Sequence, residues 1–148
     1  MNAYDVVRQT QDIDFMIASE AYPKARKVFE TAGFKEFEQA ENFSRWKGRA
    51  GFPVIVDFVF TDTTTIAQIL HYGVEKKIAG CTIKVPALDH LIAMKLHAIK
   101  QQPERRMWKD WLDILKLIER NKVDVRKEDF HTMCLKFGTS ELSKDFRS

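Results

Sequence analysis

The 148-residue sequence contains only two cysteines, Cys81 and Cys134, and they lie far apart in no spacing typical of metal ligands. We therefore expect reduced thiols, and neither a disulfide framework nor a cysteine metal site. No apolar run approaches the roughly 20 residues that span a bilayer, and no basic and apolar leader opens the chain. These absences predict a cytoplasmic protein without a membrane segment.

The sequence also lacks the glycine patterns of the P-loop and of the dinucleotide-binding fold, and it has no nucleophile elbow. Its net charge of +3 is too small to identify a nucleic-acid-binding protein. The positive charge is concentrated in residues 95–127, which carry ten basic and five acidic side chains. Such a segment is typical either of solvated helix faces or of a surface that faces phosphates.

What the sequence does contain is enough apolar bulk for a real core, with 45% hydrophobic residues and eleven phenylalanines. Periods of two and of 3.6 residues distinguish the expected strands from the expected helices. The expected strands are 12–17, 34–38, 43–47 and 54–60, with an edge hairpin over 75–85, and the expected helices are 21–32, 63–72, 88–99, 108–118 and 128–137. We therefore expect an α/β (α+β) fold, in which a mixed sheet with flanking helices over residues 1–85 precedes a helical segment over 86–148.

Three carboxylates stand in the strands of this expected core. Asp12 and Asp14 are separated by one residue, so the period of a strand puts both on the same face. Asp57 interrupts the most β-prone run of the chain, where an unpaired carboxylate is costly. If the two strands are neighbours, the three carboxylates converge within about 4–6 Å and form a site for Mg²⁺, which prefers carboxylate oxygens. Such a cluster suits phosphoryl or nucleotidyl transfer.

Each of these residues also has a plainer interpretation. Asp12 could cap a turn, Asp14 could simply face water, and Asp57 could be an ion-paired core residue. The tryptophans at helical spacing, Trp108 and Trp111, are expected in the core rather than in a base-stacking platform.

Four segments, in order, resemble the AbiEii-type nucleotidyltransferases, which belong to the polymerase-β-like superfamily and include toxins of toxin–antitoxin systems. Residues 8–15 (RQTQDIDF) are similar to the family's R-x-T-x-D-I-D segment, and residues 56–58 to the strand with its third carboxylate. Residues 88–95 (LDHLIAMK) resemble its L-I-A-x-K helix, and residues 105–113 (RRMWKDWLD) its R-x-x-K-D-x-x-D segment.

The resemblance implies a nucleotidyltransferase-like fold and transfer of a nucleoside monophosphate from a nucleoside triphosphate to a hydroxyl acceptor, such as RNA (a tRNA end) or protein. It implies a toxin role, with an antitoxin protein as a possible partner. By the same resemblance Asp12, Asp14 and Asp57 would be the catalytic residues and would bind Mg²⁺ (or Mn²⁺), with Asp57 helping to deprotonate the acceptor. The nucleotide-binding residues that it implies are Arg8, Thr10, Lys95 and Lys109.

The residues around the two lysines leave alternatives open. Lys95 lies near the apolar face of its helix and needs an anionic partner, unless its stem simply reaches to solvent. Lys109 could form a surface pair with Asp113. Asp110 and Asp113 could instead orient these lysines or Arg106.

The sequence departs from the family at one point. The family's Gly-Gly or Gly-Ser pair, whose amides bind the triphosphate, normally lies about ten residues before the first aspartate. No such pair precedes Asp12, so we expect an N-terminally short core with an incomplete triphosphate cradle. The alternative function is therefore a binding module that keeps the fold with weak or no catalysis.

Overall fold

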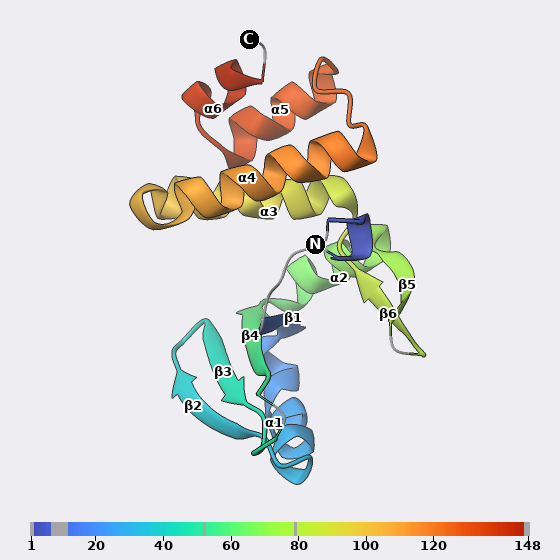
Figure 1. Cartoon of the computed structure of the whole chain (residues 1–148), viewed down its shortest axis with the longest axis vertical. Helices are drawn as coiled ribbons and strands as arrows, with labels where there is room; N and C mark the ends of the chain where they lie inside the picture. Colours follow the sequence, from blue (N-terminus) through green and yellow to red (C-terminus); the bar gives the residue numbers. More distant parts are fainter. Residues whose placement is uncertain (1, 7–11, 52, 79, 147–148) are drawn as a thin grey trace. The chain divides into compact units, whose positions relative to one another are not determined.

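The computed structural model describes residues 2–6, 12–51, 53–78 and 80–146. The chain forms two compact units, each with its own hydrophobic core (Figure 1). The sheet unit is Gln9–His71, and the helical unit is Met1–Arg8 together with Tyr72–Ser148. The sequence predicts a boundary after residue 85. The hairpin over residues 74–85 lies in the helical unit instead, where Val85 packs against the hydrophobic core.

The sheet unit is a four-stranded mixed sheet with two helices. Its elements are β1 (Asp12–Ala18), η2 (Ser19–Ala21), α1 (Tyr22–Thr31), β2 (Lys35–Gln39), β3 (Phe43–Lys47), β4 (Ile55–Thr61) and α2 (Thr63–Tyr72). The strand order is β1-β4-β3-β2, with β1 parallel to β4 and the other pairs antiparallel. The mixed sheet and the helices confirm the α+β fold class expected from the sequence.

Helix α1 covers one face of this sheet. Alternate residues of β4, Val56 and Phe58, are buried, as the strand period requires. Tyr22 and Phe29 of α1 pack on them, and the ring centroids of Phe29 and Phe58 are 4.9 Å apart. Gly33, with φ +84°, follows the end of α1 in the left-handed conformation that glycine tolerates. The residues of β4 between the buried ones therefore face the other side of the sheet.

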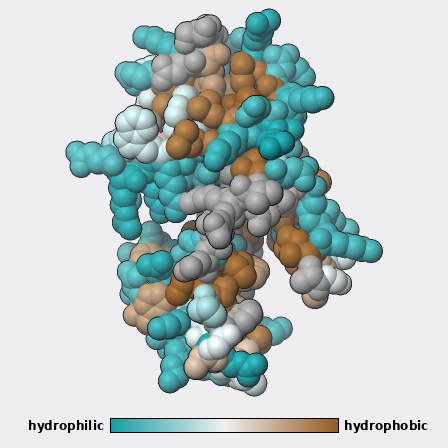
Figure 2. Space-filling model, viewed as in Figure 1, coloured by the Kyte–Doolittle hydropathy of each residue, from teal (hydrophilic) through white to brown (hydrophobic). Residues whose placement is uncertain are grey.

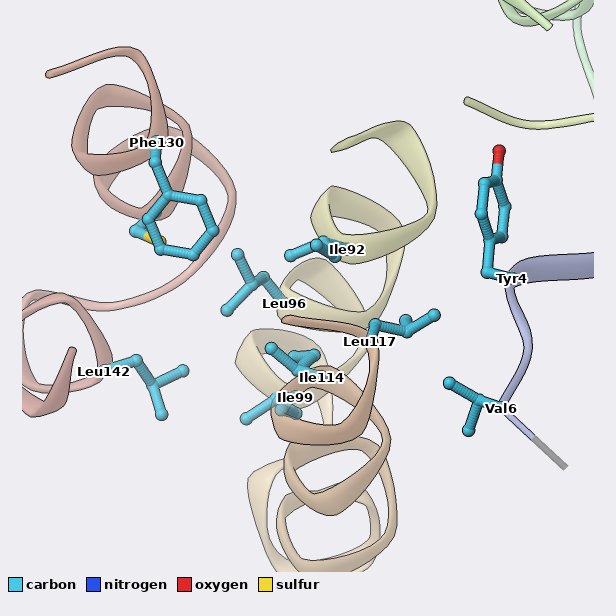
Figure 3. Packing of buried hydrophobic residues seen from close by; sticks show 10 residues of the cluster. Tyr4, Val6, Ile92, Leu96, Ile99, Ile114, Leu117, Phe130 and Leu142 are labelled. Carbon is cyan, nitrogen blue, oxygen red and sulfur yellow. The ribbon is translucent and has the colours of Figure 1, made fainter. Parts of the chain in front are cut away.

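The helical unit is built around a helix pair. Its elements are η1 (Asn2–Tyr4), β5 (Val74–Ile78), β6 (Cys81–Val85), α3 (Leu88–Gln101), α4 (Pro103–Asn121), α5 (Glu128–Phe137) and α6 (Ser140–Asp145). Figure 3 shows how buried side chains from α3, α4, α5 and α6 meet, with Tyr4 and Val6 from the N-terminal segment at one side. The residues of α3 in this core, Ile92, Leu96 and Ile99, follow the helical period.

Two further features define this unit. Gly138 stands between α5 and α6 where an added Cβ would lie 2.8 Å from the carbonyl oxygen of Cys134, so only glycine fits there.

In Figure 2 hydrophobic side chains reach the surface over α4 and α5 among hydrophilic ones. No helix in the described part of the chain is both long and apolar enough to cross a membrane.

Candidate active site

The two aspartates of β1 and the aspartate of β4 lie on one face of the sheet. The parallel register of β1 and β4 pairs Asp14 with Asp57, and Asp12 with Ile55. Paired residues of neighbouring strands point to the same side, with backbones about 4.8 Å apart. Asp12 is two residues before Asp14 and therefore shares this side. We call it the carboxylate face.

The carboxylate face is the side of the sheet that α1 leaves uncovered. Within the sheet unit, α1 packs on the side formed by Val56, Phe58 and Trp46. On the carboxylate face Asp14 is exposed, and the side chain of Asp57 is 21% exposed. Asp12 and Asp14 each interact with neighbouring groups. A partly exposed row of carboxylates beside a packed core is a geometry that can meet a phosphate-bearing ligand.

Arg45 of β3 lies beside Asp57 on the same face, because the antiparallel register pairs these two residues. Its Nε donates a hydrogen bond to Asp57 Oδ1 at 3.1 Å, and its Nη1 donates one to Glu38 Oε2 at 3.2 Å. The hydrogen bond to Asp57, followed by that to Glu38, raises the pKa of Arg45 above its ordinary value. Asp57 is therefore an ion-paired carboxylate, one of the plainer interpretations of the sequence.

The carboxylate face has the donor chemistry of a hard divalent cation, because Asp12 and Asp14 both present carboxylate oxygens. In the described residues, however, no group of three or more His, Cys, Asp or Glu side chains is placed to hold a metal ion. Asp57 is directed to Arg45 instead. Asp12 and Asp14 thus share the side of the sheet on which Asp57 stands, and one oxygen of Asp57 is engaged by Arg45.

Lys95 lies in the helical unit and contacts two carboxylates of α4. Its Nζ is 2.9 Å from Asp110 Oδ1 and 2.8 Å from Asp113 Oδ2, and all three side chains are largely buried. Arg106 approaches Asp110 Oδ2 at 3.7 Å. The anionic partner that Lys95 needs is therefore supplied by its own protein. These two carboxylates engage two of the three N–H donors of the ammonium group.

For the other expected nucleotide-binding residues, Lys109, Arg8 and Thr10, the structure gives less detail. Lys109 is exposed on α4, and Asp113 contacts Lys95. Arg8 and Thr10 lie outside the described residues. The expectation that Trp108 belongs to the core is wrong, since this side chain is 80% exposed. Trp111 is partly buried and packs against Phe146, with ring centroids 4.8 Å apart.

Arg45 is the site residue that the sequence interpretation missed. The period of two in residues 43–47 does put Arg45 on the opposite side of its strand from Ser44 and Trp46, which are buried. That alternation is visible in the sequence. The pairing of Arg45 with Asp57 is not, because it depends on the register between two strands joined by a connection of several residues.

These elements define the class of protein. Two solved structures of the antibiotic-resistance factor ANT(2'')-Ia share the fold. The solution structure has a TM-score of 0.54 and 17% sequence identity, over 99% of this chain and 74% of that chain. The crystal structure in complex with adenylyl-2''-tobramycin has a TM-score of 0.55 and 18% sequence identity, over 99% of this chain and 81% of that chain. A crystal structure of an antigenic nucleotidyltransferase-like protein from Paracoccidioides brasiliensis is also similar. Its TM-score is 0.50 at 18% sequence identity, over 93% of this chain and 75% of that chain. The fold is that of a nucleotidyltransferase.

The family follows from the sequence. The family described as nucleotidyl transferase AbiEii toxin, type IV TA system, matches residues 1–147. The chain therefore belongs to the AbiEii family and is a transferase of the nucleotidyltransferase class, which confirms the resemblance. No curated protein matches the chain.

Proposed function

We propose that this protein transfers a nucleoside monophosphate from a nucleoside triphosphate to a hydroxyl acceptor, in a Mg²⁺-dependent reaction at the carboxylate face. Asp12 and Asp14 would hold the metal and the triphosphate, and Asp57 would complete the site. The observation that carries this proposal is the register that pairs Asp14 with Asp57 on the face that α1 leaves uncovered. Membership of the AbiEii family supports it independently.

In the proposed reaction the acceptor hydroxyl oxygen forms a bond to the α-phosphorus, and the bond from that phosphorus to the bridging oxygen breaks. Pyrophosphate leaves, and the hydroxyl proton passes to the carboxylate of Asp57. A divalent cation bound at this face would neutralise charge on the triphosphate. The aspartates orient the reacting groups, and orientation alone removes a large part of the barrier of such a transfer.

The partners proposed for the reaction follow from charge and family. The excess of basic side chains in residues 95–127, including exposed Lys109, supports an acceptor rich in phosphate, such as RNA or a tRNA end. Arg8 and Thr10 are proposed to contact the nucleotide, as the family resemblance implies. The toxin family also supports an antitoxin protein as a cellular partner.

The test is transfer of label from each α-³²P-labelled ribonucleoside triphosphate to total RNA and to total protein, with Mg²⁺ or Mn²⁺. We expect label in the wild type and none with Asp14→Asn, while circular dichroism shows the variant to be folded. Glu41→Gln is the matched control, because Glu41 is an exposed carboxylate of the same unit between β2 and β3. Full transfer by Asp14→Asn would contradict the proposal.

The second candidate is a binding module with weak or no catalysis. One observation favours it: Asp57 is ion-paired with Arg45. A nucleotide-dependent rise in melting temperature, lost in Asp14→Asn but without transfer of label to any acceptor, would select this alternative.

A further inference from the structure

One row of charged side chains crosses the whole carboxylate face. The pairings Glu38 with Arg45, Arg45 with Asp57, and Asp57 with Asp14 place one residue of each strand in the row, from β2 to β1. Paired residues lie on the same side of a sheet, about 4.8 Å apart in the backbone. A carboxylate that belongs to the proposed metal site thus has an arginine on one side and an aspartate on the other.

Arg45 is held in this row by three groups. Its guanidinium bonds to Asp57 and to Glu38, and it lies over the ring of Phe37 at 5.6 Å from the centroid. Phe37 lies at the irregularity in the β2 pairing between Glu36 and Glu38. The contacts of the guanidinium with the Phe37 ring and with Glu38 do not involve Asp57, and they hold the guanidinium in place beside it. Arg45 therefore keeps an anionic partner if Asp57 is withdrawn.

Asp57 faces two competing cations. Its Oδ1 accepts from Arg45 Nε at 3.1 Å, and the described residues contain no group of three or more His, Cys, Asp or Glu placed to hold a metal ion. A divalent cation at Asp12 and Asp14 would lie next to Asp57 in the row. The Oδ1 atom of Asp57 that accepts from Arg45 would be shared with it, and the positive charge of Arg45 would repel a second cation there. The ion pair is partly exposed, at 38% for Arg45 and 21% for Asp57, so its opening is a small free-energy step.

We propose that Arg45 is a positioning residue that competes with the divalent cation for Asp57. In the metal-free protein it engages Asp57 Oδ1, and when the metal binds, Asp57 turns to the metal while Arg45 stays with Glu38. Arg45 thereby weakens metal binding to the unloaded protein and makes the third ligand available only when the metal arrives. This inference rests on the metal centre of the proposed function.

The first experiment measures binding of Mn²⁺ alone to the full chain, from the loss of the free-ion signal in electron paramagnetic resonance. We expect Arg45→Gln to bind Mn²⁺ about fivefold more tightly than the wild type, the upper range for a partly exposed ion pair. Arg26→Gln is the matched control, because Arg26 also pairs with two glutamates but lies on α1. We expect no change with this control.

The cycle with Asp57→Asn separates competition from a general field effect. If Arg45 acts by competing for Asp57, the gain from Arg45→Gln disappears in the Asp57→Asn background. A gain that persists there, or no gain in the single variant, would overturn the inference. If Asp57→Asn abolishes binding altogether, the next measurement decides.

The second experiment follows the Arg45 Nε–H resonance of the wild type by ¹⁵N nuclear magnetic resonance, identified by its loss in Arg45→Gln. We expect Mg²⁺ to shift it, because the bond to Asp57 breaks. An unchanged resonance at metal saturation, or no metal binding at all, overturns the inference. Transfer of label with unchanged Mn²⁺ affinity in Arg45→Gln would refute this inference alone. The expected metal behaviour without transfer would refute only the proposed function.

Discussion

The molecule contains two groups of carboxylates around basic side chains, and they differ in burial. In the helical unit Lys95 is bound by Asp110 and Asp113, with side-chain exposures of 13%, 5% and 6%. In the sheet unit Arg45 binds Asp57 and Glu38, with exposures of 38%, 21% and 47%. The first group is closed within a helix pair, and the second lies on a face that its own helix leaves uncovered.

The difference teaches which charges can change partner. Removing one partner of a buried ion pair leaves the other charge buried without compensation, which strongly lowers the unfolding free energy. A partly exposed pair loses little when it opens, because water replaces the partner. The central claim is therefore that the carboxylate face forms the metal and triphosphate centre. The ion pairs of Lys95 mainly stabilise the packing of α3 on α4.

The largest expected effect comes from Lys95→Met, which leaves two buried carboxylates without their shared cation. We expect the unfolding free energy to fall by about 3–5 kcal/mol, measured by urea denaturation with the helical signal at 222 nm. Lys100→Met, an exposed position on the same helix, is the control and is expected to be near neutral. A Lys95→Met variant as stable as the control would remove the contrast between the two groups.

Asp14→Asn should act on ligand binding and not on folding. With a nucleoside triphosphate and Mg²⁺ at about 100 times the dissociation constant, the wild type gains about 2.7 kcal/mol of stability. We expect this gain to vanish in the variant, while its melting temperature without ligand stays near that of the wild type. Thermal unfolding with and without ligand measures both quantities. An equal ligand-induced rise in the two proteins would place the nucleotide elsewhere.

Arg45→Gln sharpens the comparison with Lys95 directly. Because its ion pairs are partly exposed, the unfolding free energy should change by less than about 1 kcal/mol. The same urea denaturation gives this value, with the fluorescence of buried Trp46 as the probe of the sheet unit. For this measurement Trp108 and Trp111 are replaced by phenylalanine, so that Trp46 alone fluoresces. A loss as large as that from Lys95→Met would show that both groups are equally structural.

The smallest expected effect concerns pH and the helical core. Burial raises the pKa of the Cys134 thiol to about 11. Because the folded-state pKa is raised, this contribution to stability is complete below the pKa of the unfolded thiol and is lost as the pH rises through about 9 to 11. Cys134→Val should therefore lose less unfolding free energy than the wild type between pH 7 and 9, by a few tenths of a kcal/mol. The control variant is Cys81→Ser, because this second thiol is exposed and lies outside the buried core.

The sequence predicted much of the fold because local patterns carry it. The period of two identifies the strands, and by itself it puts Asp12 and Asp14 on one face of β1. The helical period identifies α3, α4 and α5. Their short partner α6 escapes it, since six residues carry too little periodicity.

What the sequence left open depends on contacts between distant residues. The face of Asp57 relative to Asp14 is set by the β1–β4 register, and a shift of one residue would have reversed it. The partners of Lys95 are 15 and 18 residues away on the next helix. Trp108 follows the helical spacing that predicts a core position, but periodicity alone does not say which side of α4 is packed.

The most direct test of the central claim is a crystal soaked with Mn²⁺ and a non-hydrolysable nucleoside triphosphate, with the metal located by its anomalous scattering. The account predicts a peak beside Asp12 and Asp14 on the carboxylate face, with Asp57 turned from Arg45 toward the metal. It also predicts an intact contact of Lys95 with Asp110 and Asp113. A peak between Asp110 and Asp113, or none beside Asp12 and Asp14, would contradict it.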